Sequence, residues 1–136
     1  MTISYWELKN DIFQGKINEV FEKNKVFFAF SELQMAEGLG KINEKREKLA
    51  SIGGGGFLPK ENIKSYLDQM MNLVEWFHCE VKKLDANKVI RYELNNYECY
   101  YTRDVGDAME VLKNYGLTRD QVLAVYHNKN AVISWN

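Results

Sequence analysis

The sequence predicts a single compact α+β domain over residues 1–136, in which a small mixed or antiparallel sheet of about three strands packs against several helices. Three observations predict this class. A chain of 136 residues with 46% hydrophobic side chains is long enough to bury one core. Apolar residues recur at helical spacing in several segments, most regularly near residues 60–84. Short apolar runs at 25–30 and 48–52 are typical of buried strands.

The first element is expected to be an amphipathic helix over residues 4–24. Its apolar side chains recur at helical spacing with polar residues between them: Trp6, Phe13, Ile17, Val20 and Phe21. A buried strand is expected next, at residues 25–30, where β-prone aromatic side chains are concentrated.

A short helix is expected over residues 32 to about 37. Ser31 and Gln34 have the spacing of a capping box, which satisfies backbone N–H groups at a helix start. Gly38 and Gly40 are expected to end this helix, because each glycine costs about 1 kcal/mol relative to alanine inside a helix.

Four consecutive glycines follow the predicted second strand: Gly53, Gly54, Gly55 and Gly56. Glycine allows a positive φ angle and close approach of the backbone. The run lacks the Gly-Lys-Ser/Thr ending of a P-loop and the spacing of a dinucleotide-binding loop. We interpret it mainly as a flexible turn between strands. The alternative is a loop that faces a ligand or a partner, with Phe57 at its end.

A long helix is expected near residues 60–84, after Pro59, the only proline of the chain. A heptad-like stripe of apolar residues defines it: Ile63, Leu67, Met70, Val74, Phe77, Val81 and Leu84. The main interpretation is that this stripe lies on the core. The alternative is a seam through which two copies of the chain form a homodimer.

Residues 86–102 fit two structures. Apolar and aromatic residues alternate on both sides of Asn95 and Asn96, which is typical of a hairpin. The same residues fit a helix over about 86–95 followed by a strand at 97–102.

Two more helices are expected in the last part of the chain. Thr102 or Asp104 caps the first of them. Thr118 and Gln121 have the spacing of a second capping box, and the helix that it opens is expected to run to about residue 128.

Histidine and cysteine, which bind metals or act in nucleophilic catalysis, are few in this chain: His78, His127, Cys79 and Cys99. No pair has the Cys-x-x-Cys or His-x-x-x-His spacing of a metal site, so no metal and no cofactor is expected. Cys99 with a histidine nearby in space would form a nucleophilic dyad. A free cysteine is more often a small buried apolar residue, and that interpretation is preferred here.

Five carboxylates are concentrated between residues 93 and 110: Glu93, Glu98, Asp104, Asp107 and Glu110. Two of them would serve as acid and base only if burial separated their pKa values. Solvated helix faces and caps produce the same cluster, so no catalytic residue is assigned and the chain is not expected to be an enzyme.

Composition restricts the partners. With 18 basic and 19 acidic side chains the formal net charge is -1, so nucleic acid is not expected as a direct ligand. No apolar run approaches the roughly 20 residues of a membrane helix, so no membrane partner is expected. Two free cysteines and no signal peptide favour a reducing cytoplasm. A tyrosine-rich segment between residues 92 and 115 suits a protein interface.

Four groups of residues carry a family resemblance: Phe28-Ala29-Phe30-Ser31 with Gln34, Glu37 and Gly38; Ser51 to Phe57; Tyr92 to Glu98; and Thr102 with Asp104 and Ala108. In these groups the chain resembles a family of small uncharacterised proteins of phages, prophages and bacteria, which carries no known activity. The family pattern implies helix then strand over residues 86–102. Similar proteins often have histidine where this chain has Tyr97, which argues against histidine chemistry there.

A phage setting implies a non-enzymatic protein-binding module, an inhibitor of a bacterial defence effector of the anti-CRISPR type in the host cytoplasm. The candidate contact residues are Gly53, Gly54, Gly55, Gly56, Phe57, Tyr92, Glu93, Asn96, Tyr97 and Glu98. One alternative is a protein that binds or sequesters a nucleotide or another small ligand with the Gly53–Gly56 loop. A second alternative is a hydrolase-like enzyme that uses Glu93, Glu98 or Cys99.

Overall fold

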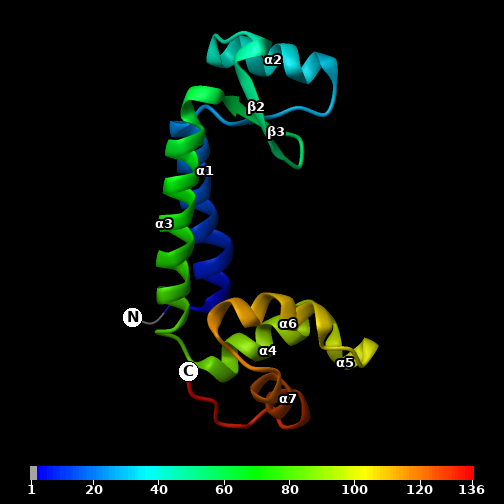
Figure 1. Ribbon diagram of the computed structural model, residues 1–136. Helices are drawn as coiled ribbons and strands as arrows, with labels where there is room; N and C mark the ends of the chain where they lie inside the picture. Colours follow the sequence, from blue (N-terminus) through cyan, green and yellow to red (C-terminus); the bar gives the residue numbers. More distant parts are fainter. Residues whose placement is uncertain (1–2) are drawn as a thin grey trace. The chain divides into compact units, whose positions relative to one another are not determined.

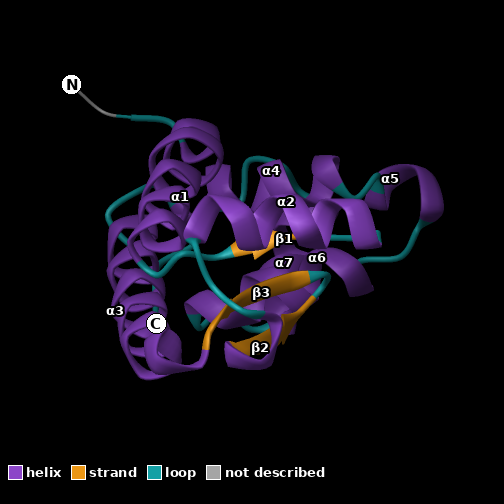
Figure 2. Ribbon diagram, turned by 90° about the horizontal axis from the view of Figure 1, so that it is seen from above, coloured by secondary structure: helices purple, strands orange, loops and turns teal. Residues whose placement is uncertain are grey.

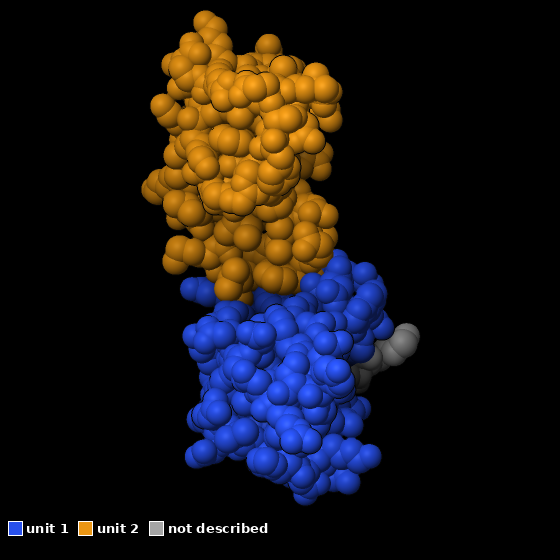
Figure 3. Space-filling view, turned by 90° about the vertical axis from the view of Figure 1, so that its right-hand side faces the viewer, with its two compact units in different colours: residues 1–12, 75–136 blue, residues 13–74 orange. Residues whose placement is uncertain are grey.

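The computed structural model describes residues 3–136, and it is mostly helical with one small antiparallel sheet (Figure 1). The predicted α+β class is therefore confirmed. The chain groups into two compact units, drawn in different colours in Figure 3. Unit 1 contains residues 3–12 and 75–136 of the described chain, and unit 2 contains residues 13–74. The single domain over residues 1–136 stays a prediction, because two units of one chain can still unfold together.

The sheet belongs to unit 2 and has the strand order β1-β3-β2, with both pairings antiparallel (Figure 2). Its strands are β1 (Phe27–Phe28), β2 (Leu49–Gly53) and β3 (Gly56–Pro59). Strand β3 is central, because Phe57 pairs with Phe27 on one side and with Ser51 on the other. The expected strand at 48–52 is thus confirmed as β2.

Helix α2 (Glu32–Ile42) is longer than predicted, because its two glycines do not end it. The Ser31 side chain accepts a hydrogen bond from the Gln34 backbone N–H, as expected for a cap. A Cβ at Gly38 would lie 2.2 Å from the Phe27 ring, so glycine lets this ring pack onto the helix. That packing offsets the low helix propensity of glycine.

The predicted buried strand at residues 25–30 is wrong in length and in burial. Only Phe27 and Phe28 pair with β3, and Phe28 and Phe30 are exposed. The strand is short because it lies at the sheet edge and because the chain enters the α2 cap at Ser31. The small core of unit 2 contains Ala29, Met35 and Leu49, with Phe27, Leu39, Ile42 and Phe57 packed against them.

The predicted helix at residues 4–24 is confirmed as a continuous helical segment. It includes a π-helical stretch, Glu7–Phe13, which continues into α1 (Gln14–Lys23). The long helix is confirmed as α3 (Ile63–Val81), preceded by a 3₁₀ turn over Lys60–Asn62. Of its apolar stripe, Phe77 and Val81 are buried but Leu67 is exposed. Dimerisation through this stripe stays a prediction.

Unit 1 is built around α4 (Ala86–Asn96), which packs against α5 (Cys99–Thr102), α6 (Gly106–Leu112) and α7 (Arg119–His127) (Figure 1). The apolar side chains between these helices are completely buried: Val89, Ile90, Leu94, Ala108, Leu112, Val122 and Val125. The capping box of Thr118 and Gln121 is present at the start of α7, as predicted.

The interpretation of residues 86–102 as helix then strand is right for the helix and wrong for the strand. Residues 97–102 contain the short helix α5 instead. Glu98 and Arg103 adopt left-handed backbone conformations, with φ of 53° and 60°, and they reverse the chain at both ends of α5. The third strand of the sheet is β3, which the sequence patterns did not predict as a strand because they assigned Gly56 to the turn and Pro59 to the entry of the long helix.

Candidate binding site

A completely buried carboxylate, Glu93, lies on α4 in unit 1. Its Oε2 atom accepts a hydrogen bond from the Tyr5 hydroxyl at 2.6 Å and pairs with Lys9 Nζ, also at 2.6 Å. The Asn96 side-chain amide donates to the other oxygen at 3.3 Å. A buried charge is tolerated only when it is paired and hydrogen-bonded, and Glu93 meets both conditions. The carboxylate therefore ties residues 5–9 to α4.

Two buried tyrosines extend this network. The hydroxyl oxygens of Tyr5 and Tyr115 are 2.7 Å apart. Because the single proton of Tyr5 is donated to Glu93, Tyr115 must donate to Tyr5. Burial, reinforced by Tyr115, raises the pKa of Tyr5 far above its ordinary value, and burial raises the pKa of Tyr115 to about 12. Both phenols keep their protons at neutral pH.

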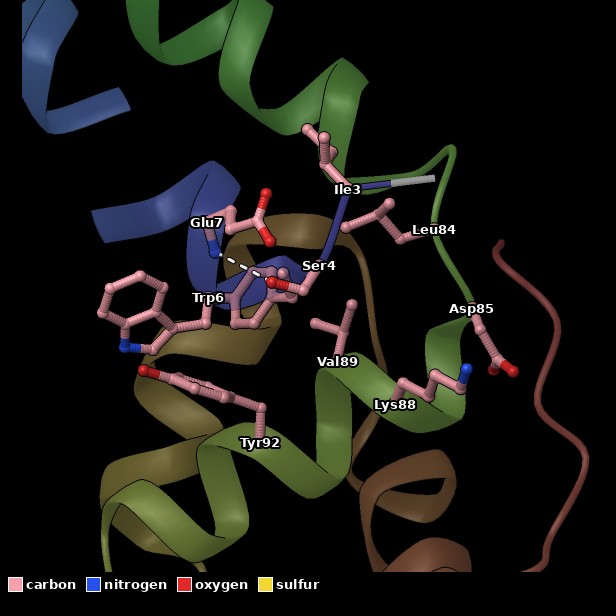
Figure 4. Close-up of a pocket in the computed structure, with 10 residues that line it drawn as sticks. Ile3, Ser4, Trp6, Glu7, Leu84, Asp85, Lys88, Val89 and Tyr92 are labelled. Atoms are coloured by element: carbon pink, nitrogen blue, oxygen red, sulfur yellow. Dashed lines mark hydrogen bonds between the residues drawn. The ribbon is translucent and has the colours of Figure 1, made fainter. Parts of the chain in front are cut away.

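A pocket of about 440 Å³ lies beside this network, and Figure 4 shows the side chains that surround it. One wall comes from the N-terminal segment and the other from α4 and the residues before it: Ile3, Ser4, Tyr5, Trp6, Glu7, Leu84, Asp85, Lys88, Val89 and Tyr92. The lining is mostly apolar. Trp6 is 50% exposed, which is high for so large an apolar side chain.

The walls of the pocket are held in place by contacts among its lining residues and with Lys9 and Asn10. The Tyr5 ring packs edge-on against the Tyr92 ring, with centroids 5.1 Å apart. Asn10 donates a hydrogen bond to the Tyr92 hydroxyl at 3.2 Å, and Lys9 Nζ lies 5.8 Å from the centroid of the Tyr92 ring. Ser4 accepts a hydrogen bond from the backbone of Glu7, drawn as a dashed line in Figure 4. The pocket is thus pre-formed.

The glycine run forms the turn between β2 and β3, so the predicted turn is confirmed. Gly53 pairs with Gly56, which leaves Gly54 and Gly55 as a two-residue hairpin loop with φ of 57° and 80°. Positive φ at both loop positions favours glycine. A Cβ at Gly55 would lie 2.3 Å from the Phe30 ring, so this ring rests on the turn. A ligand-facing role for the loop stays a prediction.

The ten candidate contact residues divide between the two units. Gly53 to Phe57 belong to unit 2 and the others to unit 1. The structure brings Tyr92, Glu93 and Asn96 together around the network and the pocket. Tyr97 and Glu98 lie exposed at the turn between α4 and α5.

Sequence reasoning missed Tyr5 and Lys9 as site residues. It named Trp6 only as part of a helix face and Tyr115 only as part of the tyrosine-rich segment. Tyr5 and Lys9 contact Glu93 across 88 and 84 residues of sequence. Their spacing of four was visible as one face of a helix, but nothing in the pattern identified the partner of that face.

Cys99 and His78, the other side chains considered for nucleophilic or acid–base chemistry, form no acid–base pair with this network. Burial raises the pKa of the Cys99 thiol, which therefore stays protonated. The His78 ring packs edge-on against Tyr115 at 5.4 Å, and burial lowers the pKa of His78. Within residues 3–136, no three histidine, cysteine or acidic side chains are grouped as a metal would require. No helix in the same range has the length and apolar character needed to cross a membrane.

A family model described as "Family of unknown function (DUF7659)" matches residues 9–134. No curated protein and no solved structure matches the chain significantly. The matched range includes α4 and the glycine hairpin, whereas the first wall of the pocket, residues 3–7, precedes it.

Proposed function

This chain belongs to that family of unknown function, and we propose that it is a non-enzymatic protein-binding module. The observation that carries the proposal is the pre-formed pocket between residues 3–7 and α4. An apolar or aromatic side chain of the partner enters this pocket and packs against Trp6 and Tyr92. Anchor residues that fill such pockets supply most of the affinity of typical protein interfaces.

Rigidity and charge support this role. The contacts of Tyr5 and Tyr92 keep the wall in place before a partner arrives, which lowers the entropy cost of binding. The exposed charged side chains beside the pocket are Glu7, Asp85 and Lys88. Acidic groups are in excess there, so the favoured partner carries a basic residue next to its anchor.

The state of the ionisable groups favours binding over catalysis. Glu93 is buried and already paired with Lys9, and the two buried phenols hold their protons. Cys99 is a buried, protonated thiol. A general base or nucleophile needs access to its substrate, and none of these buried groups has it.

In its finer form, the proposal is that the partner belongs to a bacterial defence complex and that the chain is a phage-encoded inhibitor acting in the host cytoplasm. The support is the resemblance of its FFAFS, SIGGGGF and YELNNYE segments to small phage and prophage proteins. The nearly balanced charge favours a protein surface over nucleic acid as the target.

The coarser proposal is tested with Trp6→Ala and a matched control, Tyr101→Ala. Tyr101 is an aromatic residue of the same unit, is 88% exposed and lies outside the pocket. A partner recovered on tagged wild-type protein is purified and its affinity is measured by calorimetry. We expect W6A to weaken binding at least tenfold and Y101A to leave it unchanged, with both variants folded by circular dichroism. Equal affinities for W6A and wild type would contradict the role of the pocket. Recovery of no stoichiometric partner from several bacterial hosts would contradict the function.

The finer proposal needs a biological assay. Bacteria that carry a defence system targeting a test phage are made to express wild type, W6A or Y101A. We expect wild type and Y101A to restore phage plaque formation and W6A to fail. If wild type restores plaques against none of a panel of defence systems, the inhibitor role is wrong, while the calorimetric result still decides the coarser proposal.

A further inference from the structure

A second pocket in unit 1, of about 350 Å³, is rich in cationic side chains. It lies between α4, α5 and α7 and the residues after α7, and it is lined by Arg91, Asn95, Tyr100, Tyr126, His127 and Lys129. No carboxylate lines it, although acidic residues slightly outnumber basic ones in the whole chain. The local chemistry therefore differs from the average surface and favours an anion.

Arg91 has unused hydrogen-bonding capacity. Its Nε atom is buried and has no hydrogen-bond partner among the described residues. No ion pair within residues 3–136 involves Arg91 or Lys129. Arg91 also lines a smaller neighbouring pocket of about 250 Å³, which contains Asp85, and there too it forms no ion pair. Arg91 therefore lines the pocket as a cation without a paired anion in the described part of the chain, and an anionic ligand would stabilise its guanidinium group.

Stacked aromatic rings form the second feature of the pocket. The rings of Tyr100 and Tyr126 are nearly parallel, with centroids 5.0 Å apart and an angle of 13°. His127 packs edge-on against Tyr126 at 5.2 Å. Tyr100 is 44% exposed, so one face of a ring already held by stacking remains accessible. Such faces bind planar groups, including nucleic-acid bases.

We propose that this pocket binds a small phosphate ester that carries a planar aromatic group, of which a nucleoside monophosphate is the simplest example. Arg91 and Lys129 bind the phosphate, since the planar fork of arginine matches phosphate oxygens. The base stacks on Tyr100. The volume falls in the range of small-molecule pockets, roughly 300–1,000 Å³. This site shares no lining residue with the pocket of the proposed function, and the two proposals stand independently.

The test is calorimetric titration of the full chain with adenosine, guanosine, cytidine and uridine monophosphates, with adenosine and inorganic phosphate as partial ligands. We expect at least one monophosphate to bind, and both partial ligands to bind at least tenfold more weakly. Arg91→Gln and Lys129→Gln should each weaken the binding of the monophosphate at least fivefold. Tyr100→Leu should weaken it by the same factor without changing the binding of inorganic phosphate. Lys129 is exposed, so K129Q keeps the test valid if R91Q fails to fold.

Arg119→Gln is the matched control, because Arg119 is an exposed arginine of α7 that does not line the pocket. It should bind the monophosphate as wild type does. Absence of binding by all four monophosphates overturns the proposal, as does an equal loss in R119Q and K129Q. If adenosine binds as tightly as its monophosphate, the proposed contact with the phosphate is wrong. If inorganic phosphate binds as tightly as the monophosphate, the proposed stacking of the base is wrong.

Discussion

Replacing Lys9 with methionine should destabilise the protein by about 3 kcal/mol. The substitution leaves the Glu93 carboxylate buried without its cation. Removal of one member of a buried ion pair generally costs about 3–5 kcal/mol. The lower end applies here because the Lys9 side chain is 26% exposed, and because Tyr5 and Asn96 still donate hydrogen bonds to the carboxylate.

Thermal unfolding followed by circular dichroism at pH 7 measures this loss. For a chain of this size 1 kcal/mol corresponds to roughly 3–4 °C, so Lys9→Met should lower Tm by about 10 °C. The matched control is Lys113→Met, which breaks an exposed pair with Glu110. Exposed pairs contribute at most about 1 kcal/mol, so the control should lower Tm by no more than about 4 °C.

A double-mutant cycle with Glu93→Gln identifies the cause. The neutral amide can still accept the hydrogen bond from Tyr5 but no longer needs a cation. The double variant K9M/E93Q should therefore be more stable than the sum of the two single losses predicts, by at least about 1 kcal/mol. The reasoning is refuted if K9M is no more destabilising than K113M, or if the single losses simply add.

Three further perturbations have predicted outcomes. Folding raises the pKa values of the two buried phenols above 10, the value for unfolded tyrosine, and to about 12 for Tyr115. The stability linked to these shifts is therefore fully present below pH 10. Stability should therefore fall by about 1.4 kcal/mol per pH unit for each phenol between pH 10 and 12; denaturant melts showing a flat profile would contradict this. Gly40→Ala should stabilise α2 by about 1 kcal/mol, since a Cβ there meets no atom within 4 Å, whereas Gly55→Ala should destabilise by at least about 1 kcal/mol because of its φ of 80°. If both glycine variants shift Tm in the same direction, these two predictions are refuted. Mass spectrometry after alkylation should find exposed Cys79 modified and buried Cys99 intact in native protein, and modification of both at equal rates would be the contrary result.

Local patterns predicted most of the helices and one strand, because periodicity and caps are local properties. The capping box of Thr118 and Gln121 is an example. The α2 helix exceeded its predicted end because the Phe27 ring packs onto Gly38, a contact made through the sheet rather than through the helix itself. Residues 97–102 alternate as a strand would, but the left-handed turns at Glu98 and Arg103 carry no residue signal such as glycine or asparagine.

The candidate site was predicted only in part for a related reason. Glu93 and Tyr92 were identified as candidates from their own segment. Their environment depends on residues 5–9, more than 80 positions away, and one sequence contains no measure of which distant faces meet. The same applies to Arg91, because its buried Nε atom without a hydrogen-bond partner in residues 3–136 is visible only in the structure and not from its neighbours in sequence.

The ion pair of Lys9 and Glu93 also constrains the order in which parts of the chain can fold during translation. Unit 1 is assembled from two stretches separated by residues 13–74, so its first stretch leaves the ribosome long before the carboxylate that completes it. Residues 13–74 emerge between these two stretches and contain all three strands of their sheet, so they can fold first. Until α4 is synthesised, the nascent segment containing Tyr5 and Lys9 has no native contact to make with Glu93.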